Sequence, residues 1–374
     1  MSILPPDLIT EILFLLPVKS LVRFQCVSKP WLALIEDPDF IKKQIDTNKE
    51  RSFIVETCMC WGYAHPKDYY LVKVSNENVF GEPEKMLIPR FNPSEKLRCI
   101  RISILGSCNG LVCIRNDIFE IVICNPSIQK HKKIPFEPVD DNNNKLVLDL
   151  NDGFSFGFGY DAVNNDFKVL RIVGFWESSE MFRTPPTDVE VKIFSLKANS
   201  WRRVEDQWPY KELLIVSYHW AFINGAFHWL AQSATGAYTL LAFDLTTEKF
   251  RVQMLPFDIL SIADFDVLGG SLCVALHGEA GDCEVWTMKE YGVESSWSRL
   301  WKLPEAPWQI GLLLVLSKDN KKALTKDELM RILWYDIQKK TYEIVENDHL
   351  DILKNIWTMP YVESLFLQDG DSDN

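Results

Sequence analysis

The sequence has none of the features that mark an exported or membrane-spanning chain. No apolar run in its 374 residues approaches the ~18 residues that a membrane-spanning helix needs. The first seven residues contain no Lys or Arg and reach an acid at once, so we expect no signal peptide. Both Asn-x-Ser/Thr matches, at Asn92 and Asn125, have proline in the middle and are excluded as glycosylation acceptors. We therefore expect a protein of the cytoplasm or the nucleus.

Paired cysteines and an excess of positive charge are also missing. The nine cysteines are odd in number and lie in apolar runs, which indicates free thiols in a reducing compartment. Lys and Arg number 40 against 52 Asp and Glu, a net charge of −12, so we expect no nucleic-acid or anionic-membrane partner. Hydrophobic residues make up 47% of the chain, which is enough for a buried core. The length suits one large domain with a short additional module.

The first fifty residues have helical periodicity. Residues 5 to 16 begin with two prolines and an acid, continue with Leu and Ile at helical spacing, and end at Pro17. A second short helix fits residues 19 to 26, and Ser28 is a suitable N-cap for a third, which Asp37 and Pro38 stop. Three helices in about fifty residues are near the lower size limit for independent stability. The segment either packs on the main domain as a small bundle or completes its core against another protein.

The helical region contains the segments Leu4-Pro5-Pro6-Asp7-Leu8-Ile9-Thr10-Glu11-Ile12-Leu13, Leu16-Pro17-Val18-Lys19-Ser20-Leu21-Val22-Arg23-Phe24 and Val27-Ser28-Lys29-Pro30-Trp31. Together they resemble the F-box of plant F-box proteins, without a gap from residue 3 to about 45. The resemblance implies an F-box over residues 1–45 that docks on a Skp-type linker protein and, through it, on a cullin. It implies a docking surface of nine residues: Leu4, Pro5, Leu8, Ile12, Leu13, Pro17, Val18, Leu21 and Phe24. Trp31 and Ile35 would be internal packing.

After a polar hinge at residues 46–51 the period changes from helical to alternating. Short β-rich runs separated by turn signals indicate an all-β domain over residues 52–368, followed by an acidic tail at 369–374. A glycine turn that opens an apolar strand recurs at Asn109-Gly110, Asn224-Gly225 and Gly269-Gly270. A strand–turn–strand unit recurs around Asn125, Ser195, Asp244, Thr287 and Asp336.

The spacing of the strand–turn–strand units is close to the ~40–50-residue period of propeller blades. It predicts a propeller-like domain of six or seven degenerate blades. The apolar stretch 361–367 is predicted to be a closing strand that pairs with the first blade and removes a sheet edge. As a whole the chain is expected to be α+β, a three-helix F-box followed by a large all-β domain.

Four further segments lie in this β-rich part: Gly106-Ser107-Cys108-Asn109-Gly110-Leu111-Val112-Cys113, Cys124-Asn125-Pro126-Ser127, Gly157-Phe158-Gly159-Tyr160-Asp161 and Val285-Trp286-Thr287-Met288-Lys289-Glu290-Tyr291-Gly292-Val293. They resemble, in order, the kelch-like F-box-associated domain of plant F-box proteins. The resemblance implies that this domain binds a target protein, while the F-box brings that target to the ubiquitin-transfer machinery.

Three sequence motifs resemble those of catalytic, cofactor-binding or metal sites. Residues 153–157 match the nucleophile elbow around Ser155, and residues 157–162 match a dinucleotide fingerprint, but both motifs need a following helix and a β-turn is expected here. Cys58, Cys60 and His65 lack the spacing of a structural zinc site, and core thiols are the better interpretation. We expect no catalytic residue, no metal and no cofactor.

Aromatic and basic residues in expected loops are candidates for target binding, because Trp, Tyr and Arg dominate interface energetics. The candidates are Trp176, Phe182, Arg183, Trp208 and Tyr210, with Trp308 as a further loop aromatic. Two polar insertions, residues 138–145 and 176–188, are long for a regular propeller. The competing interpretation is that the tryptophans are blade packing and the insertions are solvated connectors.

Two other functions stay open at this point. One is a hydrolase on a propeller fold, which would leave residues 3 to 45 unexplained. The other is a scaffold that uses its F-box without ubiquitin transfer. Within the family, the chain resembles defence-type and S-locus-type F-box proteins equally, so its target protein stays unidentified.

Overall fold

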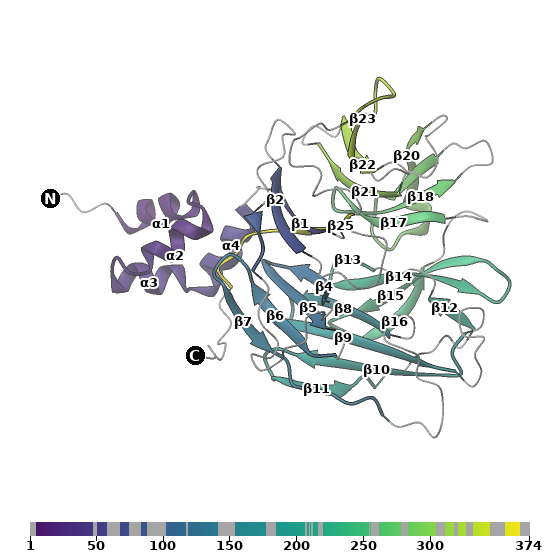
Figure 1. Cartoon of the computed structure of the whole chain (residues 1–374), viewed down its shortest axis with the longest axis horizontal. Helices are drawn as coiled ribbons and strands as arrows, with labels where there is room; N and C mark the ends of the chain where they lie inside the picture. Colours follow the sequence, from purple (N-terminus) through teal and green to yellow (C-terminus); the bar gives the residue numbers. More distant parts are fainter. Residues whose placement is uncertain are drawn as a thin grey trace. The chain divides into compact units, whose positions relative to one another are not determined.

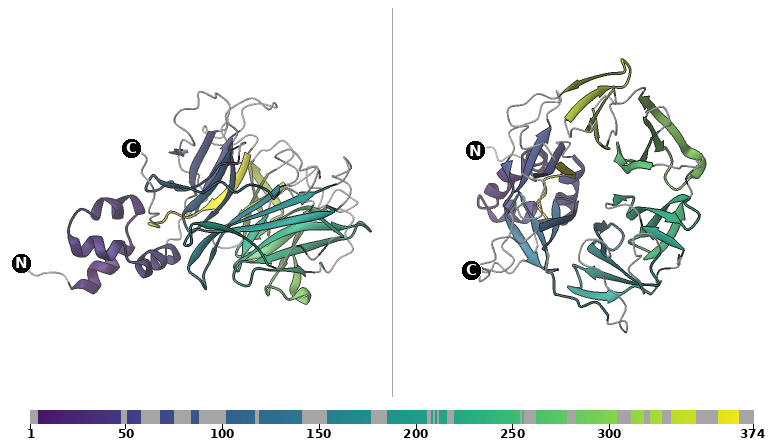
Figure 2. Two further views of the ribbon diagram at one scale, coloured as in Figure 1. Left: turned by 90° about the horizontal axis from the view of Figure 1, so that it is seen from below. Right: turned by 45° about the vertical axis from the view of Figure 1, so that its right-hand side comes forward.

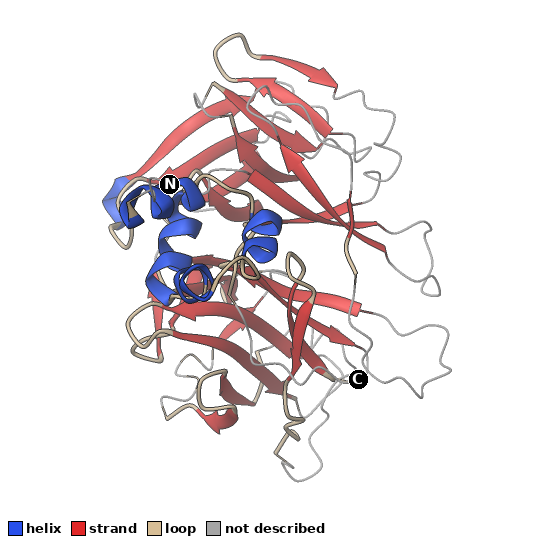
Figure 3. Cartoon of the chain, turned by 90° about the vertical axis from the view of Figure 1, so that its left-hand side faces the viewer, coloured by secondary structure: helices blue, strands red, loops and turns tan. Residues whose placement is uncertain are grey.

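The computed structural model describes residues 5–47, 51–57, 68–74, 84–87, 102–116, 119–140, 154–176, 185–205, 208, 210, 212–215, 220–253, 255, 262–277, 283–303, 311–317, 321–326, 332–344 and 356–366. In the described residues the α-helices are confined to the N-terminal part, and the rest is built mainly of strands (Figure 3). Two compact units are present, the first formed by Met1–Phe136 with Asn355–Asn374 and the second by Glu137–Lys354.

The first unit begins with four short helices (Figure 1): α1 (Pro6–Phe14), α2 (Val18–Phe24), α3 (Lys29–Ile35) and α4 (Pro38–Thr47). The Ser28 hydroxyl accepts a hydrogen bond from the backbone N–H of Trp31 at 3.3 Å, so the predicted N-cap of α3 is confirmed. Each turn between these helices contains a proline or a capping side chain that stops one helix and starts the next.

The fourth helix corrects the predicted three-helix module. The Asp37 carboxylate accepts from the backbone N–H groups of Asp39 and Phe40, so it caps α4, and Pro38 occupies the first helical turn. Asp37 and Pro38, which end α3, therefore also start α4. The predicted hinge at 46–51 is correspondingly shorter, because α4 runs to Thr47 and β1 begins at Arg51.

Two sheets complete the described part of the first unit. The first has the order β25-β1-β2-β3, with β1 (Arg51–Thr57), β2 (Asp68–Val74), β3 (Glu84–Lys85) and β25 (Ile356–Tyr361). The second has the order β4-β5-β6-β7, with β4 (Ile102–Cys108), β5 (Leu111–Asn116), β6 (Ile121–Asn125) and β7 (Lys130–Lys133). The predicted pairing of a C-terminal strand with the first sheet is confirmed, since β25 is antiparallel to β1. The strand is 356–361, and the predicted stretch 361–367 contributes only Tyr361 to it.

Four sheets make up the described part of the second unit. Their strands are β8 (Phe154–Asp161), β9 (Asp166–Phe175), β10 (Asp188–Ser195) and β11 (Ser200–Arg203); β12 (Leu213–Ile215), β13 (Ala221–Ile223), β14 (Ala226–Ser233), β15 (Tyr238–Asp244) and β16 (Lys249–Gln253); β17 (Ile262–Leu268), β18 (Ser271–His277), β19 (Cys283–Met288) and β20 (Trp297–Leu303); β21 (Gly311–Leu316), β22 (Lys322–Lys326), β23 (Ile332–Asp336) and β24 (Thr341–Ile344). A short 3-10 helix, η1 (Glu294–Ser296), lies between β19 and β20.

The repeated sequence elements correspond to the turns of these sheets. Asn109 and Gly110 both have positive φ, 48° and 79°, as a two-residue type I′ hairpin between β4 and β5 requires. Asn125, Asp244 and Asp336 begin the outer hairpins, where each side chain accepts from the backbone N–H two residues later. The described residues thus form six antiparallel sheets, and six is the lower of the two predicted blade numbers.

Candidate functional site

The first helix carries an exposed apolar stripe. Leu8, Ile12 and Leu15 follow one another at i, i+4 and i+7, and 51%, 47% and 80% of their respective surfaces are exposed. Val27, after α2, is 56% exposed. Large exposed apolar side chains on a small helical module mark a binding surface for another protein. Pro5 and Pro17, two further predicted docking residues, are also exposed.

Burial corrects the prediction for three docking residues. Leu13, Val18 and Leu21 are 0% exposed and lie in the core of the helical module, so they cannot contact a partner in this conformation. They are apolar and helically spaced like the exposed set, but they face the other side of their helices. Their role is to hold α1 and α2 in place.

The remaining predicted residues of the module have mixed positions. Phe24 is half-buried and packs edge-on against Trp31, with ring centroids 5.5 Å apart. Ile35 is fully buried, as predicted for internal packing. Leu4 lies outside the described residues. Leu15 and Val27 were absent from the predicted surface, although the spacing of Leu15 from Leu8 was a usable signal.

The core beneath the stripe is closed by α4. Phe14 of α1 stacks on Phe40 of α4 with ring centroids 4.5 Å apart, and the Lys43 ammonium lies 4.5 Å from the centroid of the Phe14 ring. These contacts hold the inner face of α1 and leave the Leu8 and Ile12 side chains exposed to solvent. The stripe is therefore exposed on a helix whose opposite face is packed.

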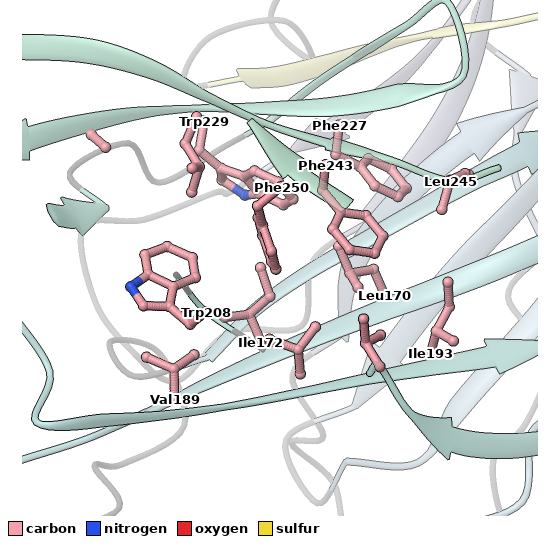
Figure 4. Close-up of a cluster of buried hydrophobic side chains, with 14 residues drawn as sticks. Leu170, Ile172, Val189, Ile193, Trp208, Phe227, Trp229, Phe243, Leu245 and Phe250 are labelled. Atoms are coloured by element: carbon pink, nitrogen blue, oxygen red, sulfur yellow. The ribbon is translucent and has the colours of Figure 1, made fainter. Parts of the chain in front are cut away.

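Two predicted target-binding tryptophans are packing residues. Trp176 and Trp208 are only 7% and 8% exposed. Trp208 lies against Phe250 in the cluster shown in Figure 4, and its indole N–H donates to the Tyr210 carbonyl at 2.8 Å. Tyr210 is half-buried beside the same cluster. Phe182, Arg183 and Trp308 lie outside the described residues, so their predicted role stays a prediction.

The start of the 138–145 insertion is anchored instead of being a solvated connector. The buried Lys192 ammonium on β10 lies 2.7 Å from the Glu137 carboxylate and 2.8 Å from that of Asp140. Hydrogen bonding to Lys192 lowers the pKa of Asp140. Arg171 on β9 donates to the carbonyl of Pro138. Residues 137–140 are thus held to the sheet, and residues 141–145 lie outside the described residues.

Ser155 has a structural contact in place of a catalytic one. It lies in β8, which continues by a hairpin into β9 and not into a helix, so the nucleophile elbow is absent at this position. Its hydroxyl accepts a hydrogen bond from the Trp229 indole N–H at 2.8 Å. In the neighbouring fingerprint match, a Cβ on Gly159 would come 2.6 Å from the ring of Phe222. Gly159 therefore permits close packing of the Phe222 ring.

Replacing Ser155 by alanine is expected to lower stability by about 1–3 kcal/mol, because the buried Trp229 N–H loses its acceptor. The measurement is urea unfolding, with Ser200→Ala, an exposed serine on β11, as the matched control. Unchanged stability would mean that water replaces the hydroxyl at this indole.

The buried thiols are poor ligands and nucleophiles. Burial raises the pKa of the Cys124 thiol to about 12. The pKa of the Cys113 thiol is also raised, mainly by burial and to a smaller extent by the neighbouring Cys124. No group of three or more His, Cys, Asp or Glu side chains suited to a metal occurs among the described residues. Cys58, Cys60 and His65 lie outside that part of the chain. None of the described helices is long and apolar enough to span a bilayer.

Comparison with known proteins agrees with this geometry. Residues 1–43 match the F-box domain family, and residues 65–366 match the family described as the F-box associated beta propeller domain. Arabidopsis thaliana F-box protein CPR1 is 30% identical over 370 residues, covering 91% of this chain and 83% of that protein. Arabidopsis thaliana F-box protein At4g22390 is 28% identical over 363 residues, covering 90% and 84%.

The chain is therefore a two-part protein, with a helical F-box and a six-bladed β-propeller domain. It belongs to the F-box proteins that carry an F-box-associated domain.

Proposed function

We propose that this protein is the target-recognition adaptor of a Skp–cullin–F-box ubiquitin ligase and is not itself an enzyme. Its F-box would bind a Skp-type linker and, through it, a cullin, while the propeller domain captures a target protein for ubiquitination and degradation. The observation that carries the proposal is the exposed apolar stripe Leu8–Ile12–Leu15 on an F-box helix. The compartment proposed for this activity is the cytoplasm or the nucleus.

The distribution of charge supports different binding roles for the F-box and the rest of the chain. Residues 1–50 hold six Lys and Arg against seven Asp and Glu, so the rest of the chain carries −11 of the total −12. An acidic body speeds encounter with a basic surface of a target and makes that association weaken with salt. The F-box, nearly neutral and apolar at α1, is suited to an apolar interface.

Replacing Leu8 and Ile12 together by alanine is expected to weaken binding to a purified Skp-type linker by ~30-fold or more, because the loss of even one central apolar anchor costs about 2 kcal/mol. Both side chains are about half exposed, so the helical circular dichroism signal should stay unchanged. The measurement is titration calorimetry with the full chain.

The matched control is Val163→Ala, an apolar side chain in the β8–β9 turn that is 76% exposed. Its linker affinity should equal that of the wild type. Undiminished linker binding by the Leu8/Ile12 variant would contradict the proposed docking surface. Reconstituted ubiquitin transfer to a captured target then separates an adaptor from a scaffold that uses the F-box without ubiquitin.

A further inference from the structure

The last described residues of the chain form part of the F-box core. After β25 ends at Tyr361, the chain continues to Phe366 beside the helices (Figure 2). Leu365 is 0% exposed and belongs to the same buried cluster as Leu13, Leu21 and Ile35. Phe366 packs against this cluster. The strap, which we define as residues 362–366, therefore supplies apolar surface that the four helices lack.

Hydrogen bonds and close packing hold the strap on the second sheet. The Asn125 side chain, fully buried at the end of β6, donates to the carbonyls of both Ser364 and Phe366 at 3.1 Å. A Cβ on Gly110 would overlap the Ser364 side chain, so this β4–β5 turn approaches the strap as closely as a glycine allows. These contacts fix the backbone on either side of Leu365.

An ion pair and a hydroxyl contact secure the start of the strap. Glu363 pairs with Lys73 of β2 at 2.9 Å, and the Tyr361 hydroxyl lies 2.8 Å from that of Ser127. The strap is thus bound to β2 and β6, and Tyr361 just before it is bound to the residues after β6. Its position does not depend on Leu365 alone.

Two chain connections enter the helical module next to each other. Tyr361, at the end of β25, is paired with Ser52, at the start of β1. The chain from α4 into β1 and the chain from β25 into the strap therefore leave the same end of the same sheet. Ile128, in the β6–β7 turn, adds a third contact with the helical cluster. The helical cluster is thus contacted by the strap and by the β6–β7 turn.

From this arrangement we infer that the strap is a component of the linker-binding module, and that Leu365 is a positioning residue for the exposed face of α1. A module of this size has a core near the lower limit of stability, and here the opposite end of the chain completes it. Loss of the Leu365 side chain removes support on the side where Leu13 is buried, and α1 presents Leu8 and Ile12 from its other side. The role in linker binding rests on the proposed function, whereas the role in the helical core does not.

The test uses the full chain with Leu365→Ala, with Leu365→Met as the rescue variant. The matched control is Val362→Ala, a half-buried strap residue outside the helical cluster. Two quantities are measured: hydrogen exchange of the α1–α3 and β14–β15 amides, and affinity for the purified linker. We expect Leu365→Ala to speed exchange in α1–α3 and to weaken linker binding, each by about tenfold or more, with β14–β15 unchanged. Leu365→Met should restore both, and Val362→Ala should change neither.

Asn125→Asp tests the same inference without a core cavity. The substitution keeps the acceptor for the Ser127 N–H but turns an oxygen toward the carbonyls of Ser364 and Phe366, so the strap should detach and α1–α3 exchange should quicken. Unchanged exchange in α1–α3 for both Leu365→Ala and Asn125→Asp would overturn the inference. If exchange quickens but the wild-type chain binds no linker, the proposed function fails and the strap's role in the helical core stands.

Discussion

Replacing Arg171 by alanine is expected to destabilise the second unit by about 3–5 kcal/mol, because it leaves the Glu190 carboxylate buried without its main partner. The Arg171 and Glu190 side chains are 6% and 1% exposed, and the guanidinium lies 2.8 Å from the carboxylate. The guanidinium also lies 5.4 Å from the centroid of the Trp201 ring. Urea unfolding, read by hydrogen exchange of the β9 and β10 amides, measures the loss.

A second variant separates two contributions to this loss of stability, the unpaired charge of Glu190 and the lost packing of Arg171. Arg171→Met combined with Glu190→Leu removes both charges and keeps apolar volume, so it should recover a large part of the stability lost in Arg171→Ala. Arg171→Ala should also loosen residues 137–140, since Arg171 donates to the Glu137 and Pro138 carbonyls and Lys192 would remain to hold the segment. A loss below about 1 kcal/mol would show that water reaches Glu190 and that the pair is not desolvated.

Replacing Leu21 by alanine is expected to cost about 2–5 kcal/mol, because it opens a cavity in the helical core of the F-box. Leu21 is 0% exposed and packs in one cluster with Leu13, Val18 and Leu365. For a module of this size, such a loss unfolds a large part of the helices. The helical signal in circular dichroism and linker binding should therefore fall together.

Leu8→Ala is the comparison for Leu21→Ala, since both remove a leucine side chain from the same module. Leu8 is 51% exposed, so its loss should weaken linker binding while the helices stay folded. The two variants thus distinguish a contact residue from a core residue. A normal helical signal and normal binding in Leu21→Ala would contradict the assignment of Leu21 to the core.

The predicted docking surface included three residues that are buried, and the reason is physical. Periodicity shows that Leu8, Ile12 and Leu13 are apolar residues of one helix, but α1 is apolar over a wide arc, and the side that faces inward depends on what packs there. The buried cluster that contains Leu13 also contains Phe40 and Leu365. No local signal near Leu13 identifies either of them.

Strand β10 shows that the sequence pattern also fails to predict which charged residues are buried. Its alternating sequence, Asp-Val-Glu-Val-Lys-Ile-Phe-Ser, is typical of a strand with one solvated face. Glu190 and Lys192 are nevertheless 1% and 5% exposed, because Arg171, Glu137 and Asp140 cover and pair with them. Trp208 was likewise assigned to an exposed loop, although Phe250 lies against it. In each case the burying partner is distant in sequence.

The amino-acid sequence by itself determined the features that depend on a few neighbouring residues: the Ser28 cap, the Asn-Gly hairpins and the family to which the chain belongs. Backbone preferences and capping act within about four residues, so they can be read locally. Only the tertiary structure decided which leucines of α1 face outward, which charges are buried and what completes the F-box core. Asn125 and Ser364, which form one of the contacts that hold the strap, are 239 residues apart. Burial depends on such distant partners, whose positions exist only once the chain has folded.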